Sequence, residues 1–158
     1  MAGKWGVDTR EWKSFQEKLE KISQNSGDDS LEYFLRRYMI NMAERVLAKT
    51  KPRTPVGTPE STGIPNYVGG TLRRNWQLGK ILVEGENISV EILNPTEYAT
   101  EVEYGHRIMG GAGHSVEVGW KDGRFMLTTS VNEIRAQMPM RFAQQWKDFC
   151  KRLGFVND

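Results

Sequence analysis

The chain has 158 residues, of which 38% are hydrophobic and 27% are charged; this composition predicts one folded domain over residues 1–158 and excludes a disordered chain. The formal net charge is only +2, which argues against a dedicated nucleic-acid-binding domain, since such domains are strongly basic. A lone cysteine, Cys150, excludes an intramolecular disulfide framework, and without an apolar leader or a run of about 18 apolar residues we expect a cytoplasmic protein that crosses no membrane.

The first third of the sequence predicts a helical part over residues 9–50. The start signal Asp8-Thr9-Arg10-Glu11 is followed by apolar residues at helical spacing, so we expect a helix from about Thr9 to Ser23. Asn25-Ser26-Gly27 breaks this helix. Asp29 then opens a second helix, whose wide apolar stripe makes it the candidate central helix.

Residues 51–70 predict a long loop. This segment, KPRTPVGTPESTGIPNYVGG, holds four of the six prolines, and proline both lacks a backbone donor and clashes inside a helix. A loop of this length in a compact domain is usually functional or disordered. We therefore expect a mobile loop that orders on a partner.

Residues 71–120 predict a small antiparallel sheet. Apolar and polar residues alternate there in short runs, as they do in half-buried strands. The runs are Leu72–Leu78, Ile81–Val83, Ile88–Ile92 and Val116–Trp120. The segment Glu84–Asn87, between the second and third runs, has the composition of a hairpin turn.

The stretch Asn94–His106, NPTEYATEVEYGH, fits either a strand or a short helix. Alternation over eight residues favours a strand. A helix would have Asn94 as its N-cap, Pro95 in its first turn and Gly105 at its end. We predict the helix, over residues 95–104, because a signal at each end is harder to obtain by chance than alternation.

The last part of the chain predicts a helix over residues 124–153 that is interrupted at Pro139. A proline inside a helix costs about 3 kcal/mol, so we expect a kink or two short helices meeting near Gln137–Pro139. Gly154 is the expected stop. Taken together, the elements predict an α+β fold, in which the N-terminal helices and the C-terminal helix pack on one face of a small antiparallel sheet.

Sequence signals for catalysis are weak. There is no nucleophile elbow, phosphate-binding glycine loop or Cys-x-x-Cys pair, and Cys150 lies beside Phe149 as a structural thiol would. Glu103, His106 and His114 are of residue types that bind zinc, but their spacing matches no tight site. We therefore expect no catalysis, no cofactor and no metal.

Charge is segregated along the chain. Residues 36–80 contain nine Lys or Arg and two Glu, whereas residues 81–106 contain six Glu and no Lys or Arg. Two solvated faces would produce this pattern. Basic and acidic patches that meet between copies of the chain, orienting their assembly, would also produce it. Both interpretations stay open at this level.

Three stretches together resemble one protein family. Thr54-Pro55-Val56 and, after an interval, Gly70-Thr71-Leu72-Arg73-Arg74-Asn75-Trp76 are similar to its T-P-V-x-T-G-x-L-R-R-S motif. Pro95 with Tyr98-Ala99-x-x-Val102-Glu103-Tyr104-Gly105 resembles its P-x-x-Y-A-x-x-V-E-[FY]-G signature, and Gly123-Arg124-Phe125-Met126-Leu127 resembles the G-[RT]-[PF]-[FM]-[LM] entry to its last helix. On these residues the chain is identified as a member of the tail-component family of tailed phages and prophages, whose members are also described as tail-completion or head–tail joining proteins. The resemblance spans about Leu31–Leu153, and an insert at Gly57–Gly69 splits the first motif.

The resemblance implies a virion structural protein, made in the bacterial host cytoplasm and located at the neck or the head-proximal end of the tail. Such proteins are similar to ring-forming subunits, often six-fold, that have no catalysis and no cofactor. The implied partners are further copies of the chain, the connector or neck, the tail tube, and DNA passing through the lumen.

Two sets of residues follow as candidates for these contacts. The predicted assembly interface combines acidic, tyrosine and arginine side chains, which specify register through charge-assisted pairs: Glu97, Tyr98, Glu101, Glu103, Tyr104, Arg73, Arg74 and Arg107. The predicted contacts of the loop with a partner or the lumen are Lys51, Arg53 and Tyr67.

A function from another class stays open beside this one. The basic residues between Arg36 and Arg74 suit contacts with phosphates, and Glu103, His106 and His114 suit metal-dependent cleavage. The chain would then be a small nucleic-acid-binding or nuclease-like accessory protein of a phage. Against this, no recognition helix and no aromatic-rich binding strand is visible in the sequence.

Overall fold

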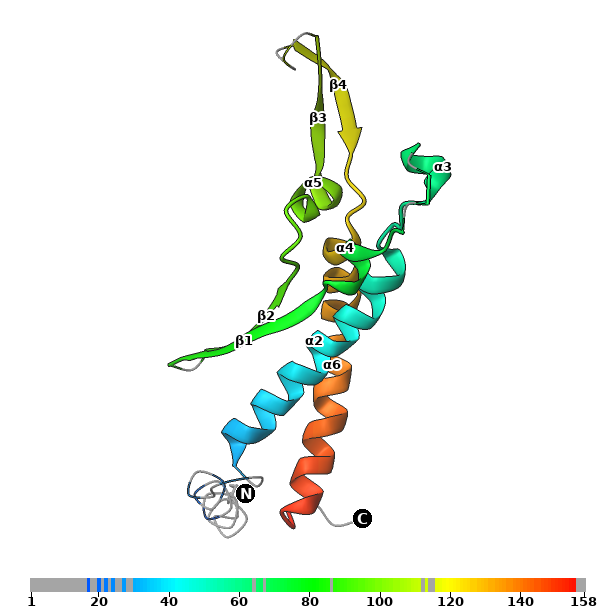
Figure 1. Ribbon diagram of the computed structural model, residues 1–158. Helices are drawn as coiled ribbons and strands as arrows, with labels where there is room; N and C mark the ends of the chain where they lie inside the picture. Colours follow the sequence, from blue (N-terminus) through cyan, green and yellow to red (C-terminus); the bar gives the residue numbers. More distant parts are fainter. Residues whose placement is uncertain are drawn as a thin grey trace, which may run out of the picture. The chain divides into compact units, whose positions relative to one another are not determined.

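Figure 1 shows the computed structural model of the chain, which describes residues 17, 20, 22, 24, 27, 30–63, 65–66, 68–85, 87–111, 113 and 116–155. The predicted helix from Thr9 to Ser23 lies largely outside these residues, as does the predicted helix start at Asp29. Contacts between Cα atoms divide the chain into a terminal unit, Met1–Tyr38 with Arg141–Asp158, and a central unit, Met39–Met140.

The terminal unit contains the beginning of one long helix and the end of another. Helix α2, Leu31–Arg53, begins in it, and helix α6, Met126–Arg152, ends in it. The ring of Phe34 lies 4.7 Å from that of Phe149 and 5.5 Å from that of Trp146, measured between centroids. Packed aromatic rings add to the stabilisation that comes from apolar burial alone. This aromatic cluster is the core of the described part of the terminal unit.

Helix α2 has a described cap at its start and ends later than predicted. The Ser30 hydroxyl accepts a hydrogen bond from the Tyr33 amide at 3.1 Å and caps the helix. At the other end the helix continues through Pro52 to Arg53, so the predicted loop begins three residues later than expected.

The segment after α2 is also more regular than its composition predicts. It contains a four-residue helix, α3, Pro59–Thr62. Thr58 and Ser61 form a capping box at its start, and Pro59 occupies its first position, where a missing amide hydrogen costs nothing. Pro59 therefore suits the start of a single helical turn.

The strands in the described part of the chain form two separate two-stranded antiparallel sheets. The first pairs β1, Gln77–Glu84, with β2, Asn87–Leu93, through a turn at Gly85, which has a φ of 59°. The second pairs β3, Gly105–Gly110, with β4, Val116–Asp122. The α+β class is confirmed, as are the predicted hairpin and the strand at Val116, with two small sheets in place of the single one expected.

The predicted strand at Leu72–Leu78 is wrong in its first half. Thr71–Arg74 forms a short helix, α4, and β1 begins only at Gln77. Leu72 and Trp76 are both buried, and two apolar residues four positions apart satisfy the helical period as well as the alternation of a strand.

The choice of a helix for the stretch after β2 is confirmed, although the helix is shorter than predicted. Helix α5 runs from Ala99 to Tyr104 and ends at Gly105, whose φ is 91°. Asn94 does not cap it. Its side-chain oxygen accepts a hydrogen bond from the Thr96 amide at 3.1 Å, which closes a local turn before the helix.

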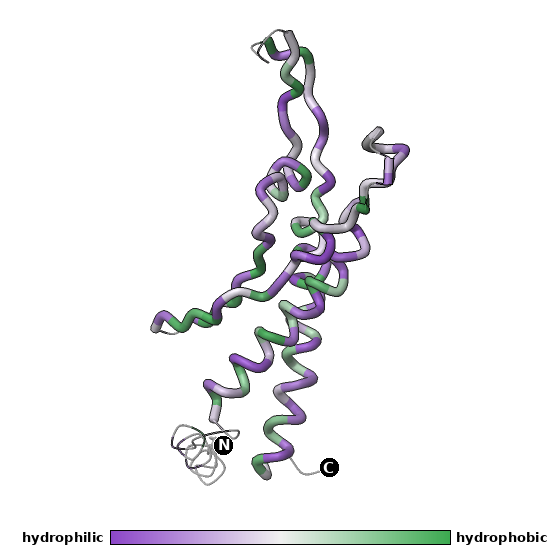
Figure 2. Tube along the Cα trace, in the orientation of Figure 1, coloured by the Kyte–Doolittle hydropathy of each residue, from purple (hydrophilic) through white to green (hydrophobic). Residues whose placement is uncertain are grey.

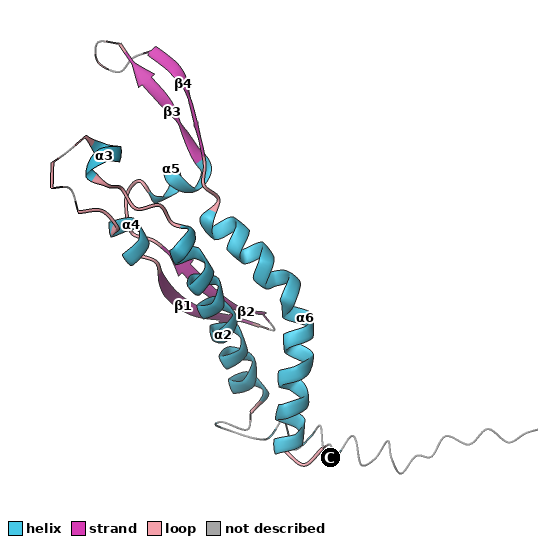
Figure 3. Cartoon of the chain, turned by 90° about the vertical axis from the view of Figure 1, so that its right-hand side faces the viewer, coloured by secondary structure: helices cyan, strands magenta, loops and turns pink. Residues whose placement is uncertain are grey.

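The core of the central unit lies where α4, α5 and the start of α6 meet. Leu72, Trp76, Ala99 and Met126 are buried together there, and half-buried residues from four elements pack against them: Leu47, Ile92, Val102 and Leu127. Helix α6 is one helix with Pro139 inside it, so the alternative of two short helices is wrong. Within the central unit, side chains from α2, β2 and α6 line a common groove. Figure 3 shows the course of these three elements.

Candidate assembly interface

The end of α2 is tied to the segment that follows the insert by Thr54. The Thr54 carbonyl accepts two hydrogen bonds from the Arg73 guanidinium, with distances of 3.0 Å to Nε and 2.6 Å to Nη2. The Thr54 hydroxyl accepts a hydrogen bond from Trp76 Nε1 at 2.8 Å and donates one to the Thr50 carbonyl at 2.8 Å. Because Thr54 is fully buried, these bonds satisfy groups that cannot reach water. Arg73, a predicted interface residue, is thus engaged within the chain.

The N-terminus of α6 is capped by Glu103, a residue of α5. Oε2 of Glu103 accepts a hydrogen bond from the Leu127 amide at 3.0 Å, and Oε1 accepts bonds from the Thr128 amide and hydroxyl, both at 2.8 Å. The first amides of a helix lack partners within the helix and carry partial positive charge, so a carboxylate there is stabilising. Glu103 is only 4% exposed. The structure therefore gives this predicted interface residue an internal role.

Two glycines allow the end of α5 to approach the start of α6. A β-carbon at either Gly105 or Gly123 would overlap backbone atoms of the facing segment. The Arg124 amide donates to the Val102 carbonyl at 2.8 Å, and the next amide donates to the Glu103 carbonyl at 3.0 Å. The second and third family-like stretches thus form one joint, which explains why each of them contains a glycine.

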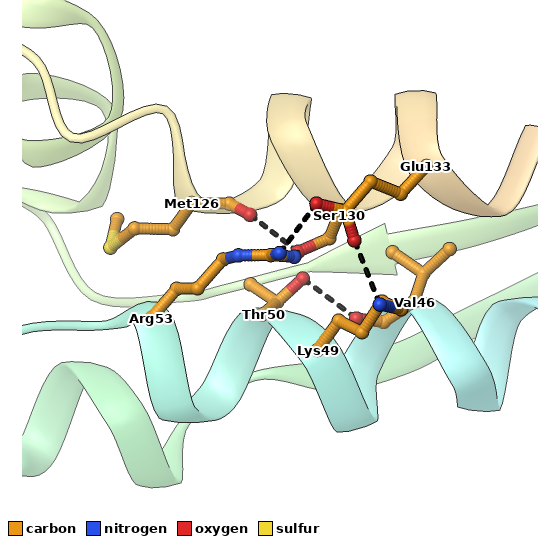
Figure 4. Close-up of polar contacts among 7 residues, drawn as sticks. All are labelled: Val46, Lys49, Thr50, Arg53, Met126, Ser130 and Glu133. Atoms are coloured by element: carbon orange, nitrogen blue, oxygen red, sulfur yellow. Dashed lines mark hydrogen bonds and ion pairs between the residues drawn. The ribbon is translucent and has the colours of Figure 1, made fainter.

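Ion pairs join α2 to α6 within the central unit (Figure 4). Glu133 accepts hydrogen bonds from Lys49 Nζ at 2.8 Å and from Arg53 Nη2 at 2.6 Å, and Arg53 Nη1 donates to Ser130 Oγ at 2.8 Å. The hydrogen bonds from Lys49 and then Arg53 lower the pKa of Glu133 below its ordinary value of 4.5. Arg53, predicted to lie on a partner-facing loop, instead belongs to the last turn of α2 and holds two helices together.

Six of the eight predicted interface residues are exposed, and the exceptions are Arg73 and Glu103. The six are Arg74, Glu97, Tyr98, Glu101, Tyr104 and Arg107. We call these six the α5 patch. Glu97 precedes α5, so it does not form the intrahelical like-charge pair with Glu101 that a longer helix would impose.

The contacts of the two α5-patch arginines with other described residues are weak. Arg74 Nη1 donates to the Gly69 carbonyl at 3.2 Å. Arg107 lies 3.5 Å from Glu117, and the two side chains are 70% and 52% exposed. Exposed ion pairs of this kind contribute little to stability, so both arginines are available to a carboxylate of another molecule.

The remaining candidate residues do not form a recognisable site among the described residues. Tyr67 and His114 lie outside the described part of the chain, and Lys51 is exposed on the last turn of α2. No group of three His, Cys, Asp or Glu residues that the structure describes is placed to hold a metal ion. His106 lines a cavity of about 160 Å³, and its buried Nδ1 has no hydrogen-bond partner there among the described atoms.

An exposed apolar surface was missed by the sequence analysis. Apolar side chains on both strands of the β3–β4 hairpin are between 41% and 62% exposed: Ile108, Met109, Val116, Val118 and Trp120. Figure 2 shows hydrophobic stretches along this hairpin. The alternation of β4 predicts a half-buried strand. One sequence feature could have indicated exposure. The glycine-rich stretch before β4 does not have the alternating apolar pattern of a strand that could cover it.

The central unit is thus a small α+β scaffold in which the family-like stretches contact one another, while the side chains of the α5 patch are exposed. Residues 13–105 match the family described as "Bacteriophage HK97-gp10, putative tail-component". The match covers more than half of the chain, and the chain belongs to this family of phage tail components. It includes the first two family-like stretches, while Gly123–Leu127 lies beyond it.

The other comparisons add nothing to this assignment. Neither the search of curated proteins nor the search of solved structures finds a match. Membership of a tail-component family implies a location in the virion. None of the helices in the described part of the chain combines the length and apolarity needed to cross a membrane.

Proposed function

We propose that the chain is a ring-forming subunit at the head–tail junction or at the head-proximal end of the tail, where it acts as a tail-completion or minor tail component without catalysis. The observation that carries this proposal is that some polar residues of the family-like stretches bond within the chain whereas others are exposed to solvent. Thr54, Arg73 and Glu103 stabilise the scaffold, while the charged and tyrosine side chains of the α5 patch remain exposed. Family membership supports the tail role.

The proposed partners follow from this position in the virion. Copies of the chain would meet through the α5 patch, where exposed glutamates and arginines of neighbouring subunits pair and fix their register. The two faces of the ring would contact the connector or neck and the tail tube, and its lumen would pass DNA without binding it by sequence.

Negative-stain microscopy and mass photometry of concentrated protein, with gel shifts on duplex DNA over a salt series, test the proposal. Rings with weak, salt-sensitive DNA binding are expected. A chain that stays monomeric at every concentration would overturn ring formation. Tight DNA binding by a monomer, or metal-dependent cleavage, would instead support the accessory-protein function, which is weakened because Lys49, Arg53 and Arg73 of its basic set contact the chain's own residues.

A further inference from the structure

The β3–β4 hairpin carries exposed apolar side chains on both of its faces. Trp120 is paired with Arg107 across the strands, and Met109 with Glu117. Next to these pairs, a bulge changes the register after Ile108. A β-carbon at Gly110 would touch Val118, which places the Val118 side chain over that part of the opposite strand.

A hairpin of this kind needs a surface to pack on. Two-stranded sheets are marginally stable in water unless another element covers them, and large exposed apolar patches on soluble proteins mark sites of interaction. Val118 is 62% exposed and Trp120 55% exposed. Among the described residues this sheet consists of β3 and β4 alone, so each strand has one edge that no further described strand pairs with.

The central unit also contains an apolar groove, and no residue of the β3–β4 hairpin lines it. A groove of about 270 Å³ is lined by residues of α2, β2 and α6. Its lining is largely apolar and includes Met39, Met42, Val90, Val131, Ile134 and Met138. An apolar cavity of about 150 Å³ admits benzene, so this groove has room for an indole ring or for two aliphatic side chains. Methionine side chains also adapt to irregular partners.

We propose that the β3–β4 hairpin of one copy docks into the α2–β2–α6 groove of the next copy, a contact that rests on the ring proposed above and supplies its apolar component. Hairpin and groove are different surfaces of the same chain, so the contact is heterologous. Heterologous contacts repeat from copy to copy and produce a closed ring when the rotation between copies fits.

Charge supports a second copy as the occupant of the groove. Arg135 is exposed on the groove wall. Glu117 is exposed on the hairpin, where its contact with Arg107 of the same chain is a loose one at 3.5 Å that an arginine of another copy can replace or share. Opposite charges beside an apolar contact orient the approach of two molecules and fix their register. One chain therefore carries an apolar projection, an apolar groove and a matching pair of charges.

Disulfide trapping tests the contact directly. In a Cys150→Ser background, Val118→Cys combined with Met138→Cys is expected to give a ladder of linked oligomers on non-reducing gels after mild oxidation. Either cysteine alone should give no ladder. Glu60→Cys on α3, combined with Met138→Cys, is the matched control and should stay monomeric. Dimers formed by Val118→Cys alone would show a symmetric hairpin contact and overturn the proposal.

A charge on the hairpin gives an independent readout. Val118→Asp lies on an exposed position, so the monomer should fold normally, while the concentration needed for half-assembly in mass photometry should rise at least about tenfold. If wild-type protein forms no rings, the proposed function fails together with this contact. If wild-type rings form, survive Val118→Asp and give no ladder, the ring stands and the hairpin contact is overturned. Intact rings that fail only to join tails would assign the hairpin to a different tail protein, which also overturns it.

Discussion

Glu103 places a carboxylate against the first amides of α6 at a position that is closed to solvent. Glu103→Gln keeps the shape of the side chain but presents one acceptor where three donors converge, and its amide nitrogen would face another donor. We expect a loss of roughly 1–3 kcal/mol in the free energy of unfolding, measured from urea transitions. Glu101→Gln, on the exposed side of the same helix, should change it by less than about 0.5 kcal/mol. Equal losses in the two variants would contradict the capping role.

Glu133 provides a pH-dependent contact between α2 and α6. Its pKa is lower in the folded chain than its ordinary value of 4.5, because Lys49 and Arg53 donate hydrogen bonds to it. A carboxyl with a lowered folded pKa stabilises the folded state above its unfolded pKa, and this contribution is lost as the pH falls through the folded pKa.

Glu133→Gln should therefore destabilise the protein at neutral pH and make little difference in acid. The difference in free energy of unfolding between wild type and variant should shrink as the pH falls below about 4.5, as followed by urea unfolding across a pH series. Glu44→Gln, an exposed substitution on α2, controls for the loss of one negative charge. A difference that stays constant with pH would refute the linkage.

The role of Glu103 as the cap of α6 could not be predicted from the sequence. A capping residue is normally sought immediately before its helix, whereas Glu103 lies 24 residues before Leu127. The available clue was negative: Arg124 and Phe125 are not residues that cap a helix, and Phe125 has a φ of 48°. A helix that begins without a local cap requires a hydrogen-bond acceptor from elsewhere in the fold for its first amides.

At the scale of the elements, sequence periodicity succeeded where one period continues for several residues. It found the apolar stripe of α2, the β1–β2 hairpin, β4 and most of α6. It failed at Leu72 and Trp76, whose spacing suits both periods, and at β3, where His106 to Gly110 has no clear alternation. The helix at α5 was predicted from a signal at each of its ends. The signal at Gly105 was correct, whereas Asn94 closes a turn before the helix and does not cap it.

Helix α6 contains Pro139 at an exposed position in its interior. Proline cannot donate the hydrogen bond of its turn, so Pro139→Ala should stabilise the helix by about 1–3 kcal/mol, reduced by the greater freedom of the unfolded chain. Urea unfolding would measure this. Met140→Ala, at the exposed neighbouring position, should have an effect below about 0.5 kcal/mol. A destabilising Pro139→Ala would mean that the fold depends on the local geometry that proline imposes.

At the scale of the whole molecule, the α5 patch should govern association without governing folding. Glu101→Lys reverses an exposed charge of this patch, so it should weaken the pairing of copies while leaving the free energy of unfolding within about 0.5 kcal/mol of wild type. Mass photometry and light scattering would report fewer oligomers.

The matched control for this charge reversal is Glu44→Lys, an exposed glutamate on α2 outside the α5 patch. It should leave the oligomers unchanged. Raising the salt concentration should reduce the difference between wild type and Glu101→Lys, because exposed charges are screened within about 10 Å at 0.1 M salt. Identical oligomers for Glu101→Lys and wild type would remove the α5 patch from the interface.

The two ends of the 57–69 insert lie back to back, so that a β-carbon at Gly69 would overlap the Gly57 carbonyl. Just outside them, Thr54 and Arg73 close the chain with two hydrogen bonds. The stability of the scaffold should therefore depend little on the residues between these two ends. Doubling the length of a flexible loop adds only about 0.6 kcal/mol to the entropic cost of closing it. A short epitope grafted in place of α3 should leave the domain intact, and an antibody or gold particle bound to it would reveal by microscopy where on a phage particle this chain resides.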